Sequence, residues 1–240
     1  MGQTNQMYQI STLQALMLGY SRGVVTVREL LRHGEIGLGT FQDVNGEMIA
    51  LDGKVYKADN AGRVTEADRM TGVPFAAVAF MDEAEEFELE EGSCIEDLKK
   101  QLNVIVDADF GLNSMYVLRM EGHFSRIKAR SEEGQRSHHV ELAEILKKNQ
   151  KDFMFEDISG VLVALYFPDY MDGINAAGWH FHFVSDDRTK GGHVYELEFD
   201  RLKAQRTRLN NIEIQLPKDK AFDTYPLKSV STEAVKAVEQ

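Results

Sequence analysis

The sequence has little cysteine and little proline. A single cysteine, Cys94, and four prolines occur among 240 residues. One cysteine cannot form an intramolecular disulfide, so a disulfide-stapled fold is excluded. The scarcity of proline, together with 43% hydrophobic residues, excludes extensive disorder. A chain of this length can bury a core without staples, as one large domain or two modest ones.

Basic residues and long hydrophobic runs are scarce as well. The chain carries 27 Lys and Arg against 39 Asp and Glu, a net charge of −12, which repels phosphate backbones and anionic lipid. Its most apolar later run, residues 161–167, is far shorter than the roughly 20 residues that span a bilayer. The N-terminal stretch is interrupted by polar side chains and lacks the basic start of a signal peptide. We therefore expect a cytoplasmic protein with no nucleic-acid or membrane partner.

The secondary-structure signals are mostly those of strands. Two capping-box spacings, Thr26–Glu29 and Ser93–Glu96, predict helices over residues 26–33 and from 95 to about 102. In the first half we predict strands over residues 38–41, 47–51, 54–57, 74–81, 115–120 and 123–130, with hairpin turns at Asp52-Gly53 and Glu121-Gly122. In the second half we predict strands over residues 161–167, 179–185, 193–199 and 212–216.

Between these halves, residues 131–139 are polar and turn-prone, and residues 140–148 are a short helical candidate. We interpret this segment as a domain connection. The prediction is an α+β, mostly β protein, with an N-terminal mixed-sheet domain over residues 1–150. A C-terminal β-sheet or barrel domain over residues 151–240 carries the histidines described next.

A cluster of histidines is the clearest chemical signal. In Trp179-His180-Phe181-His182-Phe183, strand alternation puts both histidines on one face and the three aromatic residues on the other. A loop then leads to His193 in a second alternating strand, and pairing of the two strands would bring three imidazoles together. Three histidines with open coordination positions are typical of a catalytic divalent metal site. The alternative is a strand with exposed histidines, and spacing alone does not decide between the two.

The loop between the histidine strands offers possible orienting groups. Asp186, Asp187 and Arg188 lie there, and a ligating histidine usually needs a partner for its other ring nitrogen. A solvated loop is the equally good alternative.

Longer stretches of the sequence resemble the alpha-acetolactate decarboxylase family over nearly the whole chain, in the same order. The stretches are Met7 to Leu13, Gly39-Thr40-Phe41, Gly46 to Gly53, Gly122 to Arg130, Gly160 to Tyr170, Gly173-Ile174-Asn175, Gly178 to Phe183, Asp187-Arg188 and Gly191 to Val194. This resemblance implies a cytoplasmic, homodimeric, two-domain zinc enzyme of acetoin and butanediol fermentation. It implies conversion of 2-acetolactate to acetoin and carbon dioxide.

The resemblance also assigns residues by position. The zinc ligands fall on His180, His182 and His193, the catalytic residues on Glu47, Arg130 and Glu239, and the pocket threonine on Thr40. Glu239 implies a C-terminal tail that returns to the active site, with Glu233 as the competing position. The chain departs from the family pattern in having Trp179 where tyrosine is commoner and in lacking a Pro-Tyr pair after Arg130. The second departure leaves Lys128 and Arg126 as competing positions for the arginine.

These residue types suit the implied reaction. The hydroxyl and ketone oxygens of acetolactate can chelate one metal, which as a Lewis acid draws electrons toward the ketone as the carboxylate leaves. Arg130 would orient the carboxylate, and Glu47 or Glu239 would protonate the enediolate. Three imidazoles also suit iron, copper or nickel. Two alternatives stay open, namely a cupin-like metal isomerase or lyase acting on another small hydroxy-keto acid, and a non-enzymatic binding module with a structural metal.

Overall fold

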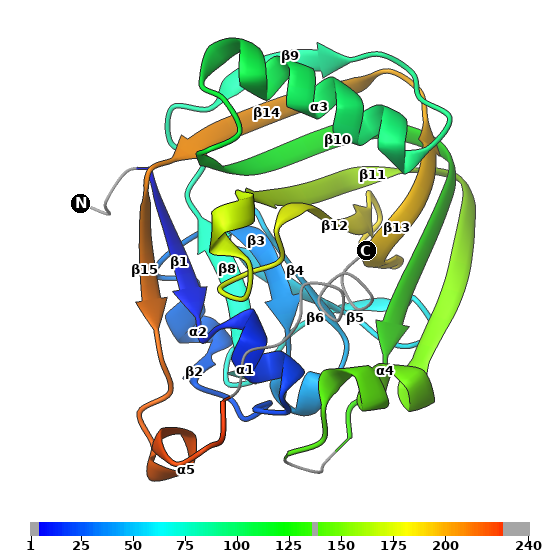
Figure 1. Cartoon of the computed structure of the whole chain (residues 1–240). Helices are drawn as coiled ribbons and strands as arrows, with labels where there is room; N and C mark the ends of the chain where they lie inside the picture. Colours follow the sequence, from blue (N-terminus) through cyan, green and yellow to red (C-terminus); the bar gives the residue numbers. More distant parts are fainter. Residues whose placement is uncertain (1–4, 136–138, 228–240) are drawn as a thin grey trace.

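Two β-sheets form the framework of the computed structural model, which describes residues 5–135 and 139–227 (Figure 1). One sheet has seven strands in the order β15-β1-β8-β3-β4-β5-β6, and the other has six in the order β11-β12-β13-β10-β14-β9. Four of these strands, β11, β12, β13 and β10, close into a ring because β10 also pairs with β11, and β14 and β9 extend the sheet beyond the ring. The expected α+β, mostly β fold is confirmed.

The elements have the following bounds. The seven-stranded sheet contains β1 (Gln6–Ile10), β3 (Ile36–Thr40), β4 (Glu47–Leu51), β5 (Lys54–Ala58), β6 (Val64–Glu66), β8 (Phe75–Ala79) and β15 (Asn211–Gln215). The six-stranded sheet contains β9 (Glu85–Leu89), β10 (Met115–Glu132), β11 (Gln150–Phe167), β12 (Gly178–Ser185), β13 (Gly191–Phe199) and β14 (Leu202–Leu209). A two-stranded ladder joins β2 (Val25–Thr26) to β7 (Gly72–Val73). The helices are α1 (Leu13–Met17), α2 (Val27–Leu30), α3 (Ile95–Asp109), α4 (Leu142–Asn149) and α5 (Lys220–Asp223), with 3₁₀ turns at Gln42–Val44 and Asp169–Met171.

Local signals in the sequence form as predicted at two places. The Thr26 hydroxyl accepts the backbone N–H of Glu29, and the Glu29 carboxylate accepts the backbone N–H of Thr26, so the capping box starts α2. Asp52 and Gly53 have φ of 54° and 71°, the two positive values that a type I′ hairpin turn requires between β4 and β5.

The predicted hairpin at Glu121-Gly122 is wrong, because β10 continues through both residues. The strand pairs with β11 from Tyr116 to Glu132, while its other edge passes from β14 to β13. A side chain at Gly122 would lie 2.6 Å from the Cδ2 atom of Leu202. The glycine therefore permits the close approach of β14 and does not mark a turn. The helix α3 also runs on to Asp109, beyond the predicted end.

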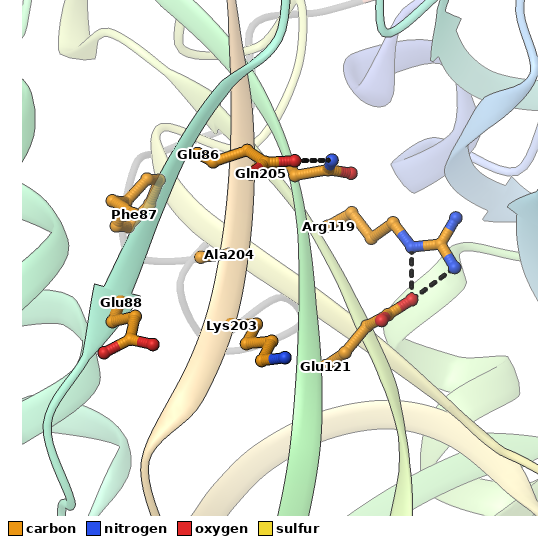
Figure 2. A pocket seen from close by; sticks show the side chains of 8 residues that line it. All are labelled: Glu86, Phe87, Glu88, Arg119, Glu121, Lys203, Ala204 and Gln205. Carbon is orange, nitrogen blue, oxygen red and sulfur yellow. Dashed lines mark hydrogen bonds and ion pairs between the residues drawn. The ribbon is translucent and has the colours of Figure 1, made fainter.

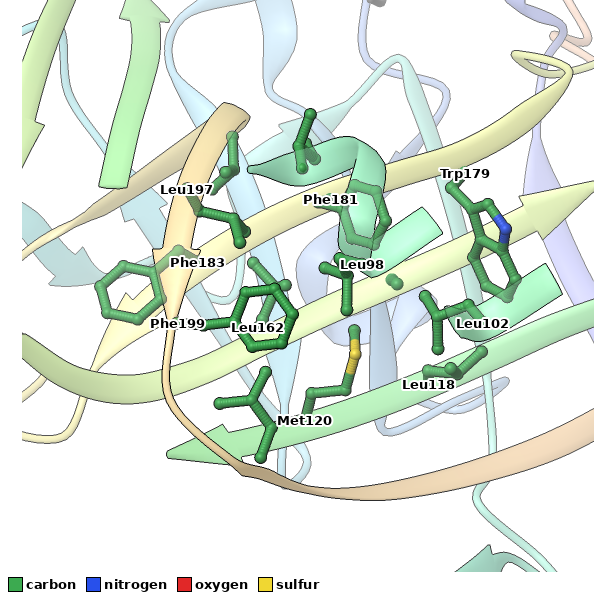
Figure 3. Packing of buried hydrophobic residues seen from close by; sticks show 14 of the residues in the cluster. Leu98, Leu102, Leu118, Met120, Leu162, Trp179, Phe181, Phe183, Leu197 and Phe199 are labelled. Carbon is green, nitrogen blue, oxygen red and sulfur yellow. The ribbon is translucent and has the colours of Figure 1, made fainter. Parts of the chain in front are cut away.

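The hydrophobic core has a layer on each side of β11 and β12. Trp179, Phe181 and Phe183 of β12 pack with Leu98 and Leu102 of α3 (Figure 3). The opposite layer joins Val161, Val163 and Leu165 of β11 to residues of β3 and β4, including Leu38 and Ile49. The expected aromatic face of β12 is thus buried under α3, which leaves its histidine face directed toward the seven-stranded sheet.

The two sheets do not divide at residue 150. Strands β9 and β10 precede that residue and belong to the six-stranded sheet, whereas β15 follows it and pairs in parallel with β1. The segment that we interpreted as a domain connection contains α4 and links β10 to β11, two paired strands of one sheet. The two-domain division stays a prediction. Within the described ranges, no helix is both long and apolar enough to cross a membrane.

Candidate metal centre and active site

Three histidines meet where β12 and β13 pair. His182 lies opposite His193 in the ladder, and His180 precedes His182 by two residues on the same face. The ring centroids are 4.7 Å apart for His180 and His193, 4.9 Å for His180 and His182, and 5.3 Å for His182 and His193. All three are buried, and one ring nitrogen from each lies within 4.8 Å of the others. This geometry matches the pairing that brings the imidazoles together.

The hydrogen bonds of these rings fit a metal. The Nδ1–H of His182 donates to the carbonyl oxygen of Met48 at 2.8 Å, which leaves the Nε2 lone pair directed inward. That Nε2 atom is buried without a hydrogen bond to any described residue, and Oε2 of Glu47 lies 3.5 Å from it. Nε2 of His180 lies 2.9 Å from Nδ1 of His193. At that separation two lone pairs repel unless a proton or a cation lies between them.

Burial keeps His180 and His182 neutral. It lowers the pKa of His180 well below its ordinary value, and the nearby His182 and Arg130 act in the same direction. Burial also lowers the pKa of His182 to about 4, against the opposing effect of the hydrogen bond to Met48. Neutral imidazoles keep the lone pair that a divalent metal needs. The donor set therefore fits a divalent metal ion with three histidine ligands.

The hairpin of β3 and β4 brings Thr40 and Glu47 to the histidines. These two residues are register partners, and the Thr40 hydroxyl donates to the carbonyl oxygen of Gly46 at 3.0 Å. In the connecting loop Asp43 and Val44 have φ of 65° and 56°. A positive φ is uncommon for a β-branched residue such as Val44. Two contacts hold this conformation. The N–H of Asp43 donates to the carbonyl of Ser21 at 2.9 Å, and the side chain of Val44 is buried.

Strand β10 supplies the cationic group. Arg130 is the register partner of His193, and its Nη2 atom lies 3.1 Å from Nε2 of that ring. The next residue, Ser131, is completely buried and connects β10 to the seven-stranded sheet. Its hydroxyl accepts the backbone N–H of Glu47 at 3.2 Å and donates to the carbonyl oxygen of Ala58 at 2.9 Å. Ser131 thus fixes the backbone of Glu47 relative to the strand that carries Arg130.

A cavity of about 40 Å³ lies among these groups. Its polar lining is Thr40, Glu47, Arg130, Glu132, His180 and His193, and its apolar lining includes Leu16, Val44, Phe75, Leu142 and Leu146. The lining therefore combines charged and hydrogen-bonding groups with hydrophobic ones. Such a cavity holds a small molecule that has both oxygen functions and alkyl groups.

The structure brings most of the expected site residues together. Thr40, Glu47, Arg130, His180 and His193 line the cavity, and His182 adjoins it through its contact with Glu47. Glu239 and its competitor Glu233 lie outside the described residues, as does the tail that carries them.

Sequence reasoning missed three contributors, namely Ser131, Glu132 and the carbonyl of Met48. It also considered the loop residues Asp186 and Asp187 as partners of the imidazoles. Instead the Asp187 carboxylate accepts hydrogen bonds from Ser185 and Thr189 within its own turn. The predicted strand ended at residue 130, so the alternation that puts Glu132 on the same face as Arg130 became visible only with the longer β10 of the structure.

A larger hollow lies away from the histidines, on the face of β9, β10 and β14 (Figure 2). It measures about 690 Å³ and is lined mainly by charged and polar side chains. These groups pair with one another, since Arg119 contacts Glu121 and the Gln205 amide donates to Glu86 at 3.0 Å. We therefore place the candidate active site at the histidines.

The chain is similar to proteins of one family. Residues 7–229 match the family model for alpha-acetolactate decarboxylase. The alpha-acetolactate decarboxylase of Brevibacillus brevis is 32% identical over 235 residues, which are 98% of this chain and 81% of that protein. The alpha-acetolactate decarboxylase of Methanosarcina mazei is 37% identical over 195 residues, 81% of this chain and 66% of that protein.

Solved structures agree with these sequence matches. The crystal structure of alpha-acetolactate decarboxylase from Bacillus subtilis strain 168 superposes with a TM-score of 0.91 at 27% identity, covering 98% of this chain and 99% of that one. A Staphylococcus aureus protein described as similar to alpha-acetolactate decarboxylase superposes with a TM-score of 0.89, also at 27% identity, over 98% of this chain and 100% of that one.

Proposed function

The chain belongs to the alpha-acetolactate decarboxylase family and is an enzyme of that kind, and from this premise we propose how its site works. The proposed reaction is the metal-dependent decarboxylation of 2-acetolactate to acetoin and carbon dioxide, in the pathway to acetoin and butanediol. The proposed cofactor is Zn²⁺. The observation that carries the proposal is the buried three-histidine group beside Glu47 and Arg130.

His180, His182 and His193 would hold the metal. When bound, it supplies Lewis-acid polarisation of the hydroxyl and ketone oxygens of the substrate. The carbonyl of Met48 fixes the tautomer of His182, so that its Nε2 stays unprotonated and directed inward. Burial keeps His180 and His182 neutral and ready to ligate.

Arg130 binds the substrate carboxylate. Its guanidinium offers the paired N–H donors that match a carboxylate, and it lies on the β10 side of the cavity next to His193. This contact orients the carboxylate, so that the carbon–carbon bond to be broken points toward β10. The apolar residues of the lining, such as Val44 and Leu142, receive the methyl groups and exclude water from the intermediate.

A carboxyl group completes the reaction. Loss of carbon dioxide leaves an enediolate, which becomes acetoin only when a proton is added to carbon. The family resemblance points to Glu47 or Glu239 for this role. Thr40, at the edge of the cavity, contributes to the pocket that receives the substrate. The resemblance also leads us to propose that the protein is a cytoplasmic homodimer. Light scattering would measure the mass of the dimer in solution.

The test is turnover of racemic 2-acetolactate by the purified protein. Acetoin and carbon dioxide are measured before chelation, after chelation, and after adding back zinc, iron, copper or nickel separately. The proposal expects activity that is lost on chelation and restored best by zinc. If folded, zinc-loaded protein forms no acetoin above the spontaneous rate, the proposed reaction is wrong. The same substrate screen separates it from a cupin-like isomerase or lyase acting on another hydroxy-keto acid.

A further inference from the structure

The apolar side chains of the cavity come from one small hydrophobic cluster. The cluster joins residues of α1, the 3₁₀ turn after β3, the start of β8 and α4, and we call it the α1/α4 cluster. Its members are Leu13, Leu16, Met17, Val44, Phe75, Val140, Leu142, Ile145, Leu146 and Ala176. Half of them reach the cavity, namely Leu16, Val44, Phe75, Leu142 and Leu146. The α1/α4 cluster is therefore both a part of the core and the surface that the alkyl groups of a substrate would touch.

We propose that Leu142 and Leu146 of α4 set the largest alkyl group that the substrate can carry, and so determine which 2-hydroxy-3-keto acids the enzyme decarboxylates. This inference rests on the proposed reaction and deepens it by naming residues that select the substrate by size. The metal and the charged residues act on the oxygen functions that all these acids share. Only the alkyl groups distinguish one acid from another.

The helix α4 is the part of the lining whose size the sheets do not fix. Phe75 is the register partner of Thr40 in the ladder of β3 and β8, and Val44 is buried in the tight turn between β3 and β4. Leu142 and Leu146 come instead from a helix that belongs to neither sheet. The room beside α4 therefore depends on how these two side chains fill it.

The two leucines lie on the same face of α4. They are four residues apart, which places them one above the other along the helix. Leu142 is buried and Leu146 is half-buried. Ile145 is completely buried in the same cluster, yet it does not line the cavity. The helix thus presents two leucines to the cavity, and Ile145 only to the cluster.

The cavity is small enough for a single methylene to matter. Its volume is about 40 Å³, whereas one water molecule alone needs roughly 10–15 Å³. The surrounding core is close-packed, so added alkyl atoms find little free space. A hydrophobic pocket discriminates one methylene by about 10- to 200-fold in kcat/KM. A longer alkyl group is therefore disfavoured unless the side chains around it become shorter.

The experiment measures kcat/KM of the zinc-loaded protein for two series of racemic homologues of 2-acetolactate. One series lengthens the alkyl group on C2 from methyl to ethyl to propyl, and the other lengthens the group on the ketone in the same way. Every homologue keeps the carboxylate, hydroxyl and ketone, so the series vary only the alkyl contacts. Carbon dioxide release is followed and the spontaneous rate subtracted. For the unsubstituted chain we expect kcat/KM to fall by about 10-fold or more from methyl to propyl in at least one series.

Variants of α4 test which side chains set this limit. Leu142→Ala and Leu146→Ala each remove three carbon atoms from the lining, so we expect the ratio of kcat/KM for propyl over methyl to rise by about 10-fold. Leu146→Phe adds volume and should lower that ratio. Ile145→Ala is the matched control, because it removes as many carbon atoms from the same helix and cluster without lining the cavity. It should leave the ratio unchanged, and all four variants should keep their zinc.

A rise in one series alone supports the inference and shows which alkyl group lies against α4. The inference is overturned if neither leucine variant changes the ratio in either series, if Ile145→Ala changes it as much, or if the unsubstituted chain accepts all the homologues equally. Circular dichroism checks folding. If an alanine variant does not fold, Leu142→Val and Leu146→Val remove one carbon atom each and should shift the ratio in the same direction by less; an unchanged ratio again overturns the inference.

The outcome for 2-acetolactate itself separates this inference from the proposed function. If the unsubstituted, zinc-loaded chain forms no acetoin from 2-acetolactate, the proposed reaction has failed. If it forms acetoin and the leucine variants keep the preference of the unsubstituted chain, the reaction stands and only the role of α4 is wrong.

Discussion

Replacement of Ser131 by alanine tests the connection between the two sheets at the active site. The Ser131 hydroxyl is completely buried and makes two hydrogen bonds, one from the N–H of Glu47 at 3.2 Å and one to the carbonyl of Ala58 at 2.9 Å. Each buried group that loses its partner costs about 1–3 kcal/mol. Two groups lose their partner, so we expect the free energy of unfolding to fall by about 2–6 kcal/mol.

Activity should fall separately from stability. The hydrogen bond from the N–H of Glu47 to the Ser131 hydroxyl holds β4 to β10. Without this hydrogen bond, the Glu47 carboxyl can shift relative to Arg130. A misplacement of about 1 Å in an active site lowers turnover by up to about 10²-fold. We expect kcat to fall by about 10- to 100-fold. Zinc content should stay unchanged, because the three histidines come from β12 and β13.

Urea denaturation and acetoin formation measure the two effects, and Ser125→Ala is the matched control. Ser125 is an exposed serine on the same strand, 3.4 Å from a carboxylate oxygen of Glu198. Its replacement should change the free energy of unfolding by less than about 0.5 kcal/mol. If Ser131→Ala proves as stable and as active as Ser125→Ala, the idea that this hydroxyl positions Glu47 is refuted.

Two further predictions concern histidines. His182→Ala should lose bound zinc, measured by elemental analysis, and all acetoin formation, while circular dichroism stays native; stoichiometric zinc in this variant would contradict the ligand assignment. Hydrogen bonds to Asp157 and Asp200 raise the pKa of His123 above its ordinary value of 6.5. The charged form of His123 therefore stabilises the fold fully at a pH below 6.5, and this contribution is lost as the pH rises through the raised pKa. His123→Asn should therefore lower the thermal midpoint more near pH 5.5 than near pH 9; equal losses would rule this out.

The local features of the fold were predictable because neighbouring residues determine them. The capping box of Thr26 and the turn at Asp52-Gly53 depend on contacts a few residues apart. The same is true of β12, where period-two alternation was enough to separate the histidine face from the aromatic face. Glycine misled at Gly122, because the same residue type serves both a turn and the close approach of another strand.

The composition of the candidate site was only partly contained in such patterns. Periodicity placed His180 and His182 on one face of a strand. The position of His193 depended on an assumed pairing of two strands, and the structure shows this pairing between β12 and β13. Glu47, Arg130 and Thr40 had no distinguishing local signal, and only the family resemblance singled them out.

The sequence by itself determined the class of the protein, most of its strands and the histidine face. The tertiary structure alone decided which distant groups meet there: the Met48 carbonyl on His182, the Ser131 hydroxyl on Glu47, and Glu132 in the cavity wall. Local signals arise from residues a few positions apart. These contacts join residues 84 to 134 positions apart, or depend on the closure of a ring of strands, so they form only when β10, β12 and β4 are packed together.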